Sequence, residues 1–286
     1  MSVILPVLVN GAVLSSTYVL MALGLTLVFG VMGIVNFAHG SIYMVGMFIS
    51  VYFLGQLGLN YFVVIVIAAL MTAVIGMLIE RFLFTPLRQN FNGALLVTLG
   101  LIGVIDQSVA LIFGAKASGA GVPSPFGRVL HFAGVSLSLD RLVVVAICVV
   151  LAAGLLVFIK RAKHGQAMMA AAENAEGASL QGVNIANIRL LCMAIGCALA
   201  GAAGAVTAPL SYATPEVGDM VIMKIFILVV FGGLGSIPGA IVGGLIVGFA
   251  DSIAGTYLNA DVAPVIVYGA LFVILMIRPT GIWGHE

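Results

Sequence analysis

Charge is scarce in this 286-residue sequence. It has 11 Lys and Arg residues and 10 Asp and Glu residues, or 7% of the chain, where a soluble domain carries about 25%. Hydrophobic residues make up 63% of the chain, and the mean hydropathy is +1.28. So few polar side chains cannot cover a water-facing globule, which indicates a protein whose surface faces lipid.

The first part of the chain lacks charged side chains altogether, since no Asp, Glu, Lys or Arg occurs before Glu80. A signal peptide has an apolar core of only about 7–15 residues behind a basic flank, so this segment is too long to be one. It must hold several consecutive spans. The net charge of +1 also excludes a polybasic partner surface for nucleic acid.

Cysteine is equally rare, and the motifs of common enzymes are missing. Cys148, Cys192 and Cys197 lie in apolar runs without metal spacing, which excludes a disulfide framework and a zinc site. The sequence has no Gly-x4-Gly-Lys-Ser/Thr loop, no His-x-x-Glu-His and no Gly-x-Ser-x-Gly. We therefore expect no enzyme, no bound metal and no cofactor, and any ATP would be hydrolysed by another chain.

Apolar runs long enough to cross about 30 Å of hydrocarbon recur throughout the sequence. Backbone amides in lipid must be satisfied within their own segment, so each run is predicted to be a helix. The runs are 7–29, 34–54, 62–79, 93–113, 142–159, 190–210, 225–250 and 262–277. They predict an all-α, polytopic transmembrane bundle over residues 1–286, a single domain with eight spans, or nine if 225–250 is a hairpin.

Basic residues orient the predicted spans, because cytoplasmic loops are enriched in Lys and Arg. The densest cluster is Lys160, Arg161 and Lys163, followed by Arg81 with Arg88, and then Arg278. Placing these on the cytoplasmic side makes the loop 114–141 external and the C-terminus cytoplasmic. The N-terminus has no charge to orient it.

A glycine-rich stretch places polar side chains inside the predicted membrane region. Residues 28–41 read Val-Phe-Gly-Val-Met-Gly-Ile-Val-Asn-Phe-Ala-His-Gly-Ser. Polar groups there usually face a bundle interior or a water-filled cavity, and neighbouring glycines allow a helix to break. Either these residues lie on a solute pathway or its gate, or they hydrogen-bond between helices. The pathway interpretation involves Asn36, Phe37, His39 and Ser41.

A second stretch, residues 230–240, reads Val-Phe-Gly-Gly-Leu-Gly-Ser-Ile-Pro-Gly-Ala and echoes the first. Broken segments at corresponding places in two halves point to the translocation site of repeat-built transporters, although glycines match easily by chance. The residues assigned here to the pathway or gate are Gly232, Gly233, Gly235, Ser236 and Pro238.

A third stretch, about 165–188, follows the main basic cluster. Its Ala, Met, Gln and Glu residues favour a helix, and Gly182 is expected to end it. A helix outside the bilayer that shows small apolar residues is either a solvated surface helix or a coupling helix that docks in a partner's groove, and docking is favoured. The residues expected to contact the partner are Glu173, Glu176, Ala178, Gly182 and Asn184.

Some acidic and polar residues stay ambiguous. Asp106 and Gln107 lie within a predicted span, where an acid is a functional candidate by default but can also pair with a neighbouring helix. Asp219 and Lys224 flank a predicted external loop, where they are either solvated, which is the default expectation, or in contact with a partner protein. Asp251 and Asp261 bracket the last external turn and are expected to be solvated.

Three motifs in this order resemble those of LivH-type permeases of ATP-binding-cassette importers. They are Gly-Ile-Val-Asn-Phe-Ala-His-Gly at 33–40, Glu-x-Ala-x-x-x-Gly at 176–182 and Phe-Gly-Gly-Leu-Gly-Ser-Ile-Pro-Gly at 231–239. The resemblance runs from about Val7 to Arg278. In such families a Glu-Ala-Ala-x-x-x-Gly loop touches the ATPases; here Gly177 replaces the first Ala, and the spacing is kept.

The resemblance implies the ABC importer permease fold, with branched-chain or other hydrophobic amino acids as substrate. It also implies a LivM-like second permease, two cytoplasmic ATP-binding subunits and an extracytoplasmic solute-binding protein. The location would be the inner membrane of a bacterium or archaeon. We expect ATP-driven movement of the 165–188 helix to rearrange the broken segments at 30–40 and 232–239.

Two other functions remain open from the sequence. One is a permease for another small polar solute, such as urea, a short amide or a simple sugar. The other is an ATP-independent secondary transporter, against which the predicted docking helix argues, since a self-sufficient carrier does not need one.

Overall fold

The structure is a computed structural model that describes residues 4–87, 90–114, 121–132 and 135–258, and singly Val265, Gly269, Met276 and Gly281. The described chain is almost entirely helical. In order, its elements are α1 (Ile4–Met32), α2 (His39–Ser50) with the π-helical η1 (Val51–Gln56), α3 (Tyr61–Ile79) with η2 (Glu80–Phe84) and η3 (Thr85–Leu87), α4 (Phe91–Phe113), β1 (Val129–Phe132), β2 (Val135–Ser138), α5 (Leu139–Arg161), α6 (Lys163–Glu173), α7 (Ala175–Leu180), α8 (Ile185–Thr207) with η5 (Ala208–Leu210), α9 (Val217–Gly232) and α10 (Ile237–Tyr257).

Within the described residues, six helical stretches are long and apolar enough to cross a membrane. They are α1, Tyr61–Leu87, α4, α5, Ile185–Leu210 and α10. The predicted all-α transmembrane bundle is confirmed, while the predicted count of eight or nine spans is only approximate. The run 34–54 forms the shorter α2 and its π-helical extension. The run 225–250 breaks between α9 and α10, as in the hairpin alternative, and 262–277 lies almost wholly outside the described residues.

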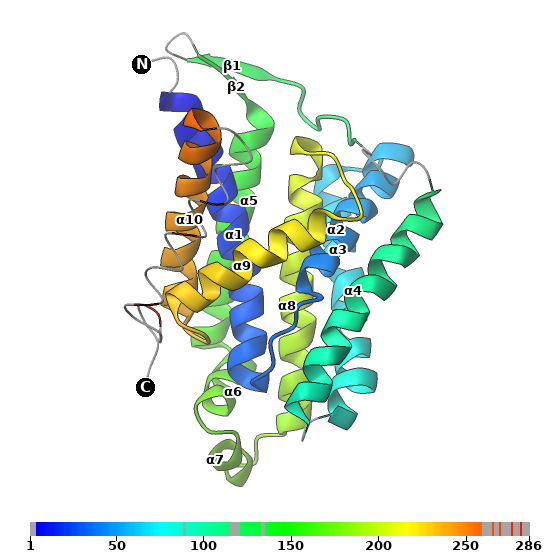
Figure 1. Ribbon diagram of the computed structural model, residues 1–286, viewed down its shortest axis with the longest axis vertical. Helices are drawn as coiled ribbons and strands as arrows, with labels where there is room; N and C mark the ends of the chain where they lie inside the picture. Colours follow the sequence, from blue (N-terminus) through cyan, green and yellow to red (C-terminus); the bar gives the residue numbers. More distant parts are fainter. Residues whose placement is uncertain are drawn as a thin grey trace.

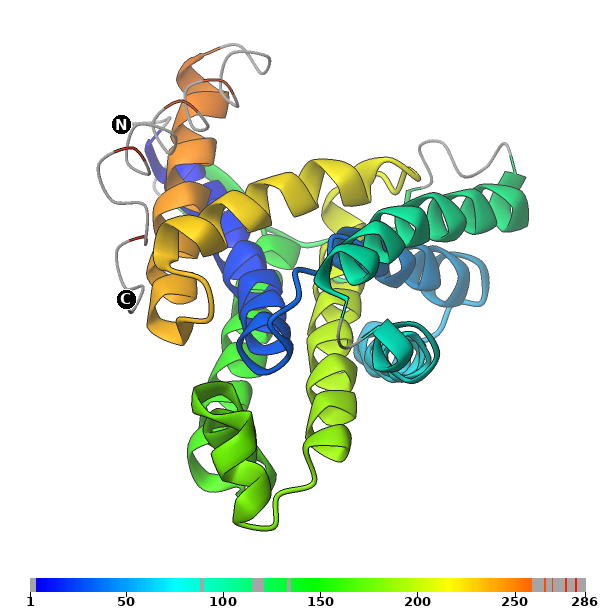
Figure 2. The same ribbon diagram turned by 60° about the horizontal axis from the view of Figure 1, so that its bottom comes forward.

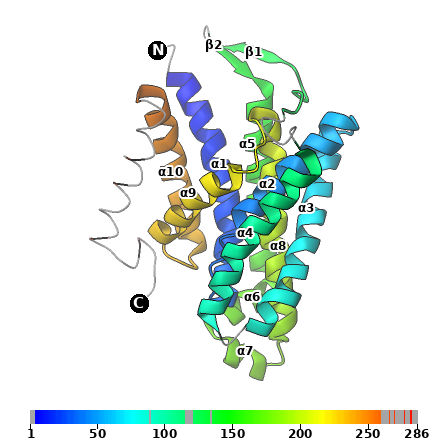
Figure 3. The ribbon, with the colours of Figure 1, turned by 45° about the vertical axis from the view of Figure 1, so that its right-hand side comes forward.

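The helices are arranged around α8, which stands in the middle of the bundle (Figure 1). It packs against α3, α2 and α1, while α1 also packs against α10 and α5 (Figure 3). The outer helices α4 and α5 leave much of their apolar surface exposed, including Leu96, Leu111 and Val150. Such a surface is suited to lipid.

The two ends of the bundle differ in chemistry. Helices α6 and α7 lie together at one end, as Figure 2 shows, and the hairpin of β1 and β2 lies at the other, where α1 begins. The basic cluster Lys160, Arg161 and Lys163 is at the α6–α7 end. By the positive-inside rule this end is predicted to face the cytoplasm.

Polar residues mark the starts of several helices. The side chains of Asn60, Asn90, Ser138, Asn184 and Ser236 each precede a helix and accept a hydrogen bond from an amide two or three residues later. An Asn or Ser at this position satisfies an amide that the helix itself leaves without a partner. The sequence thus fixes these helix starts locally.

Glycines allow the central helices to meet backbone to backbone. A β-carbon at Gly46 of α2 would collide with the Gly201 carbonyl group of α8. Where α2 begins, Gly40 and Gly218 of α9 face each other in the same way. Helices in lipid associate through close packing rather than through a hydrophobic effect, and small residues make that packing possible.

The predicted external loop contains a hairpin that the sequence analysis did not anticipate. Strands β1 and β2 pair antiparallel, with Leu130 opposite Leu137. Just after them, the buried carboxylate of Asp140 accepts hydrogen bonds from the Phe126 amide at 3.2 Å and the Ser138 hydroxyl at 3.0 Å, and a third from the Ser124 hydroxyl. Asp140 therefore ties the loop to the start of α5.

The glycine contacts yield a stability prediction. Gly46→Ala should destabilise the folded chain by about 1–3 kcal/mol, the usual cost of overpacking, because the Gly201 backbone cannot move aside cheaply. The measurement is the midpoint of thermal unfolding in detergent. Gly154→Ala is the matched control, since a β-carbon at Gly154 on α5 meets open space. Equal midpoints for the two variants would contradict the packing argument.

Candidate functional site

The chain leaves helical geometry between α1 and α2, as the first glycine-rich stretch predicted. Gly33 has φ +67°, a conformation that side chains other than glycine rarely adopt. Residues 33–36 then run back into the bundle before α2 begins at His39 (Figure 1). The Asn36 side-chain oxygen accepts a hydrogen bond from the Ala38 amide at 3.1 Å, which stabilises the turn into α2.

Polar atoms around this break are buried without hydrogen bonds. Asn36 and His39 are 0% exposed. Within the described residues, no hydrogen bond of acceptable geometry reaches Asn36 Nδ2, Ser41 Oγ or either ring nitrogen of His39, although the ring lies beside the Met21 backbone. Leaving such a group unsatisfied costs about 1–3 kcal/mol. These groups are therefore available to partners from outside the chain or to a second arrangement of the helices.

Helices α1, α8 and α9 surround the break. The His39 ring packs against Gly24 of α1, where a β-carbon would lie 3.2 Å from Nε2. The Phe37 ring packs against Phe226 of α9, with ring centroids 5.2 Å apart. Because Gly40 also meets α9, any movement of α9 acts directly on the start of α2.

Asp106 and Gln107, which the sequence analysis considered together, lie on different faces of α4. Asp106 faces inward from α4 beside Ser41, with Glu216 and Asp219 close enough to act on it electrostatically. Its Oδ1 atom is buried without a hydrogen-bond partner in the described chain. Gln107 is exposed on the outer face of α4. Only Asp106 therefore lies near the α1–α2 break.

The second glycine-rich stretch forms the sharp turn between α9 and α10. Gly233 has φ +100°, and the Ser236 hydroxyl accepts a hydrogen bond from the Gly239 amide at 3.2 Å to cap α10. Pro238 occupies the first turn of that helix, a position where proline is tolerated. Gly232 lies against Gly239, so the turn closes backbone to backbone.

A cavity of about 790 Å³ joins this turn to the end of α1 and to α6. Its lining residues are Phe29, Gly30, Gly33, Met169, Ala172, Glu173, Leu234, Gly235, Ser236, Ile237 and Pro238. The structure thus brings together Glu173 and the two broken segments at the predicted cytoplasmic end. Asn36, His39 and Ser41 do not line it, so the residues predicted for the pathway fall into two separate places.

The predicted single helix over about 165–188 is instead two helices, α6 and α7. They are separated at Asn174, whose side-chain oxygen accepts a hydrogen bond from the Gly177 amide at 2.8 Å. The prediction missed this helix-start signal. Gly182, at φ +84°, follows the end of α7 as predicted, and Asn184 caps α8 through the Asn187 amide at 3.1 Å.

The surface of α6 and α7 is mixed. Glu173 and Glu176 are exposed, whereas Ala178 is buried. Leu180, which the sequence analysis did not single out, is 83% exposed at the end of α7. An exposed leucine outside the membrane spans is the kind of residue that anchors a partner interface, since burying it there would be favourable.

A polar network that the sequence did not predict links three helices. Lys224 Nζ of α9 lies 2.6 Å from Asp251 Oδ2 of α10, and the Tyr18 hydroxyl of α1 donates to the same oxygen at 2.7 Å. The side chains of Lys224 and Asp251 are only 23% and 10% exposed. The expectation that both are solvated in external turns is wrong, because α9 runs obliquely across the bundle and carries Lys224 to α10 (Figure 1).

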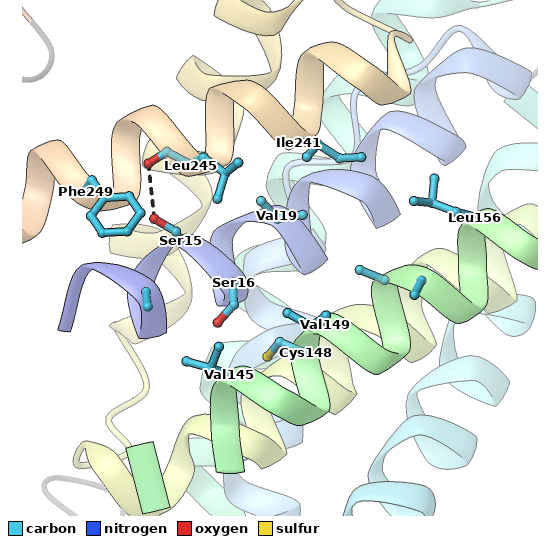
Figure 4. A pocket seen from close by; sticks show the side chains of 13 residues that line it. Ser15, Ser16, Val19, Val145, Cys148, Val149, Leu156, Ile241, Leu245 and Phe249 are labelled. Carbon is cyan, nitrogen blue, oxygen red and sulfur yellow. Dashed lines mark hydrogen bonds between the residues drawn. The ribbon is translucent and has the colours of Figure 1, made fainter. Parts of the chain in front are cut away.

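An apolar groove of about 390 Å³ lies between α1, α5 and α10 (Figure 4). Its two serine hydroxyls are satisfied by backbone carbonyls: Ser15 donates to Leu245 at 3.1 Å and Ser16 to Val13 at 3.0 Å. The groove therefore presents no free polar group to a solute. Nor do the described residues contain a group of three His, Cys, Asp or Glu side chains that could hold a metal ion.

Comparison with known proteins gives a consistent result. Residues 7–277 match the family described as branched-chain amino acid transport system / permease component. The chain is 34% identical to the high-affinity branched-chain amino acid transport system permease protein LivH of Escherichia coli strain K12, covering 96% of this chain and 94% of the relative. It is 35% identical to the corresponding BraD of Pseudomonas aeruginosa, covering 97% and 95%.

A more distant relative is a probable branched-chain amino acid transport permease protein LivH of Methanocaldococcus jannaschii. It is 28% identical, covering 98% of this chain and 92% of the relative. No solved structure matches the chain.

The polar network leads to a test of stability. Lys224→Met should lower the free energy of unfolding by about 2 kcal/mol, below the roughly 3–5 kcal/mol of a fully buried pair, because it leaves the Asp251 carboxylate without its cation. Adding Asp251→Asn should restore much of the loss. Thermal unfolding in detergent measures both, and Lys163→Met, at an exposed lysine, is the control. A double variant no more stable than the single one would show that the pair is not coupled.

Proposed function

The chain belongs to the family of branched-chain amino acid transport permease components, and from that premise we propose that it is the transmembrane permease subunit of an ATP-binding-cassette importer. Its cargo is a branched-chain or other hydrophobic amino acid. It forms the pathway with a second permease, receives cargo from an extracytoplasmic solute-binding protein and binds no cofactor itself. Two separate cytoplasmic subunits hydrolyse ATP.

One observation carries the pathway assignment. The break between α1 and α2 holds buried polar atoms without a hydrogen bond of acceptable geometry in the described chain, namely Asn36 Nδ2, both ring nitrogens of His39, and Ser41 Oγ, which lies beside Asp106. In a lipid-embedded bundle, polar groups of this kind mark solute routes or the elements that gate them. Their position at a helix break, against the oblique α9, supports a gate that opens when α9 and α2 separate.

The position of α6 and α7 supports coupling to a partner. Helix α6 packs against α1, α5 and α8, and its Ala172 lies against Gly30, which in turn meets Gly235. A force applied to α6 and α7 therefore reaches the end of α1 and the α9–α10 turn through direct contacts. ATP binding shifts the permease between two states if the ATPases contact those states differently.

Transport by the assembled complex tests the proposal. The complex, purified through a tag on this chain and reconstituted in proteoliposomes with its solute-binding protein, should accumulate radiolabelled leucine only when ATP is supplied on the ATPase side. Leu180→Asp should reduce both the yield of ATPase subunits and the uptake at least about tenfold, because a carboxylate at this exposed position opposes burial in an apolar groove.

The matched control is Gln181→Asp, which adds the same charge at the next exposed position and should have a much smaller effect. If the purified chain brought down no ATPase and took up leucine in an ion gradient without ATP, it would be a secondary carrier and the proposal would be wrong.

The gate assignment makes a second prediction, in which one substitution should lower uptake but not stability and another should lower stability but not uptake. His39→Leu should leave thermal stability unchanged or raised, because it removes a polar group that has no partner, and should lower uptake per folded molecule. Tyr61→Phe removes a hydroxyl that donates to the Val206 carbonyl at 2.7 Å, so it should lower stability and leave uptake per folded molecule unchanged. Normal uptake by the His39→Leu variant would return His39 to a structural role.

A further inference from the structure

A second cavity, lined by apolar and some polar residues, lies on the other side of the α1–α2 break from the one at the predicted cytoplasmic end. It has a volume of about 260 Å³ and is bounded by α1, α2, α5, α8 with η5, and α9. Arg141 lines it from the start of α5, at the opposite end of that helix from Lys160 and Arg161, and so in its predicted external half. Ligand pockets for drug-sized molecules measure about 300–1,000 Å³, so this cavity is suited to a smaller solute.

Arg141 brings a positive charge to the cavity. Its side chain is partly buried, and no described residue forms an ion pair or a hydrogen bond with its guanidinium. The neighbouring Asp140 is already occupied by three donors from the loop, and Asp251 by Lys224. A guanidinium in this setting is well placed to bind a carboxylate through two parallel hydrogen bonds.

Other lining groups fit the rest of an amino acid. The side-chain amide of Asn10 on α1 has no hydrogen-bond partner in the described chain, and its oxygen is an acceptor for an ammonium group. The hydroxyls of Tyr43 and Thr207 are 2.7 Å apart and add further oxygen acceptors. Leu14 and Val221 supply apolar walls. The cavity is therefore lined by a guanidinium donor, by several oxygen acceptors and by aliphatic side chains.

The cavity is also next to the gate. Tyr43 lies one helical turn beyond His39 on α2, and Val221 lies on α9 one turn from Gly218, which meets Gly40. A solute held here would stand directly outside the contact between α2 and α9.

We propose that this cavity is an entry site that holds an aliphatic α-amino acid as its zwitterion. Arg141 binds the carboxylate, Asn10 accepts from the ammonium group, and the side chain packs on Leu14 and Val221. This inference rests on the proposed function for the cargo class and adds the place and the residues that recognise it.

Ligand-observed NMR on the full chain in lipid nanodiscs tests the site directly, with three related probes. L-leucine carries both charged groups, L-leucinamide lacks the carboxylate, and 4-methylpentanoate lacks the ammonium group. Saturation transfer should be strongest for leucine. Equal apparent affinities for leucine and leucinamide would overturn the role of Arg141, and this comparison needs no variant.

Two substitutions should give a crossed pattern. Arg141→Met should lower the affinity for leucine and for 4-methylpentanoate at least about tenfold, the loss expected when a charge-assisted hydrogen bond is removed. Arg141→Lys should recover part of that affinity. Asn10→Leu should lower the affinity for leucine but not for 4-methylpentanoate, which lacks the ammonium group. Arg128→Met is the control, because Arg128 is an exposed arginine of the same external segment that does not line the cavity.

The outcomes separate this inference from the proposed function. If wild-type chain gave no signal with leucine, or Arg141→Met bound it as well as wild type, the entry site would be wrong even where the complex imports leucine with ATP. If leucine bound in the predicted pattern but the complex showed no ATP-driven uptake, the site would stand and the proposed function would fail.

Discussion

The architecture depends on close contacts between helix backbones at glycine. Gly46 of α2 packs against Gly201 of α8, and Gly204 of α8 packs against the α2 backbone. Gly201 also contacts α3, and Gly40 of α2 packs against Gly218 of α9. Lipid supplies no hydrophobic force to press helices together, so a side chain at these crossings would remove the packing that replaces it. The same contacts wedge the start of α2 inside the bundle, and so place the polar residues of the α1–α2 break where lipid and bulk water are excluded.

This placement has an energetic consequence that bears on function. Each unsatisfied polar group at the break costs stability, so the packing around α2 must offset the burial of Asn36 and His39. In a second arrangement of the helices, these groups could form hydrogen bonds, and the free energy gained would offset part of the packing energy lost around α2. The direct chain of contacts from Ala172 through Gly30 to Gly235 then offers a route by which α6 biases the balance.

Local signals in the sequence predicted local features well. The glycines at Gly33 and Gly233 predicted the two helix breaks, and Gly182 predicted the end of α7. These predictions were possible because tolerance of a positive φ is a property of glycine itself. The Asn174 cap was available in the same way and was overlooked. Features that join distant segments were out of reach: Lys224 meets Tyr18 across 206 positions, and nothing local reveals that α9 lies obliquely. The exposure of Leu180 likewise depends on how α7 packs, not on its own sequence.

The polar groups of the described chain are of two kinds, those paired within the protein and those without a partner there. Lys224, Asp251 and Asp140 have partners within the protein, and each ties one element to another: α9 to α10, and the external segment to α5. The Arg141 guanidinium, Asn36 Nδ2, the His39 ring nitrogens and Ser41 Oγ have no hydrogen bond of acceptable geometry among the described residues. An unpaired charge within a membrane protein faces a cavity or a binding site, and Arg141 lines such a cavity. Under the proposed function these groups lie along the route from the predicted external cavity to the gate, and the glycine contacts between α2 and α9 lie across that route.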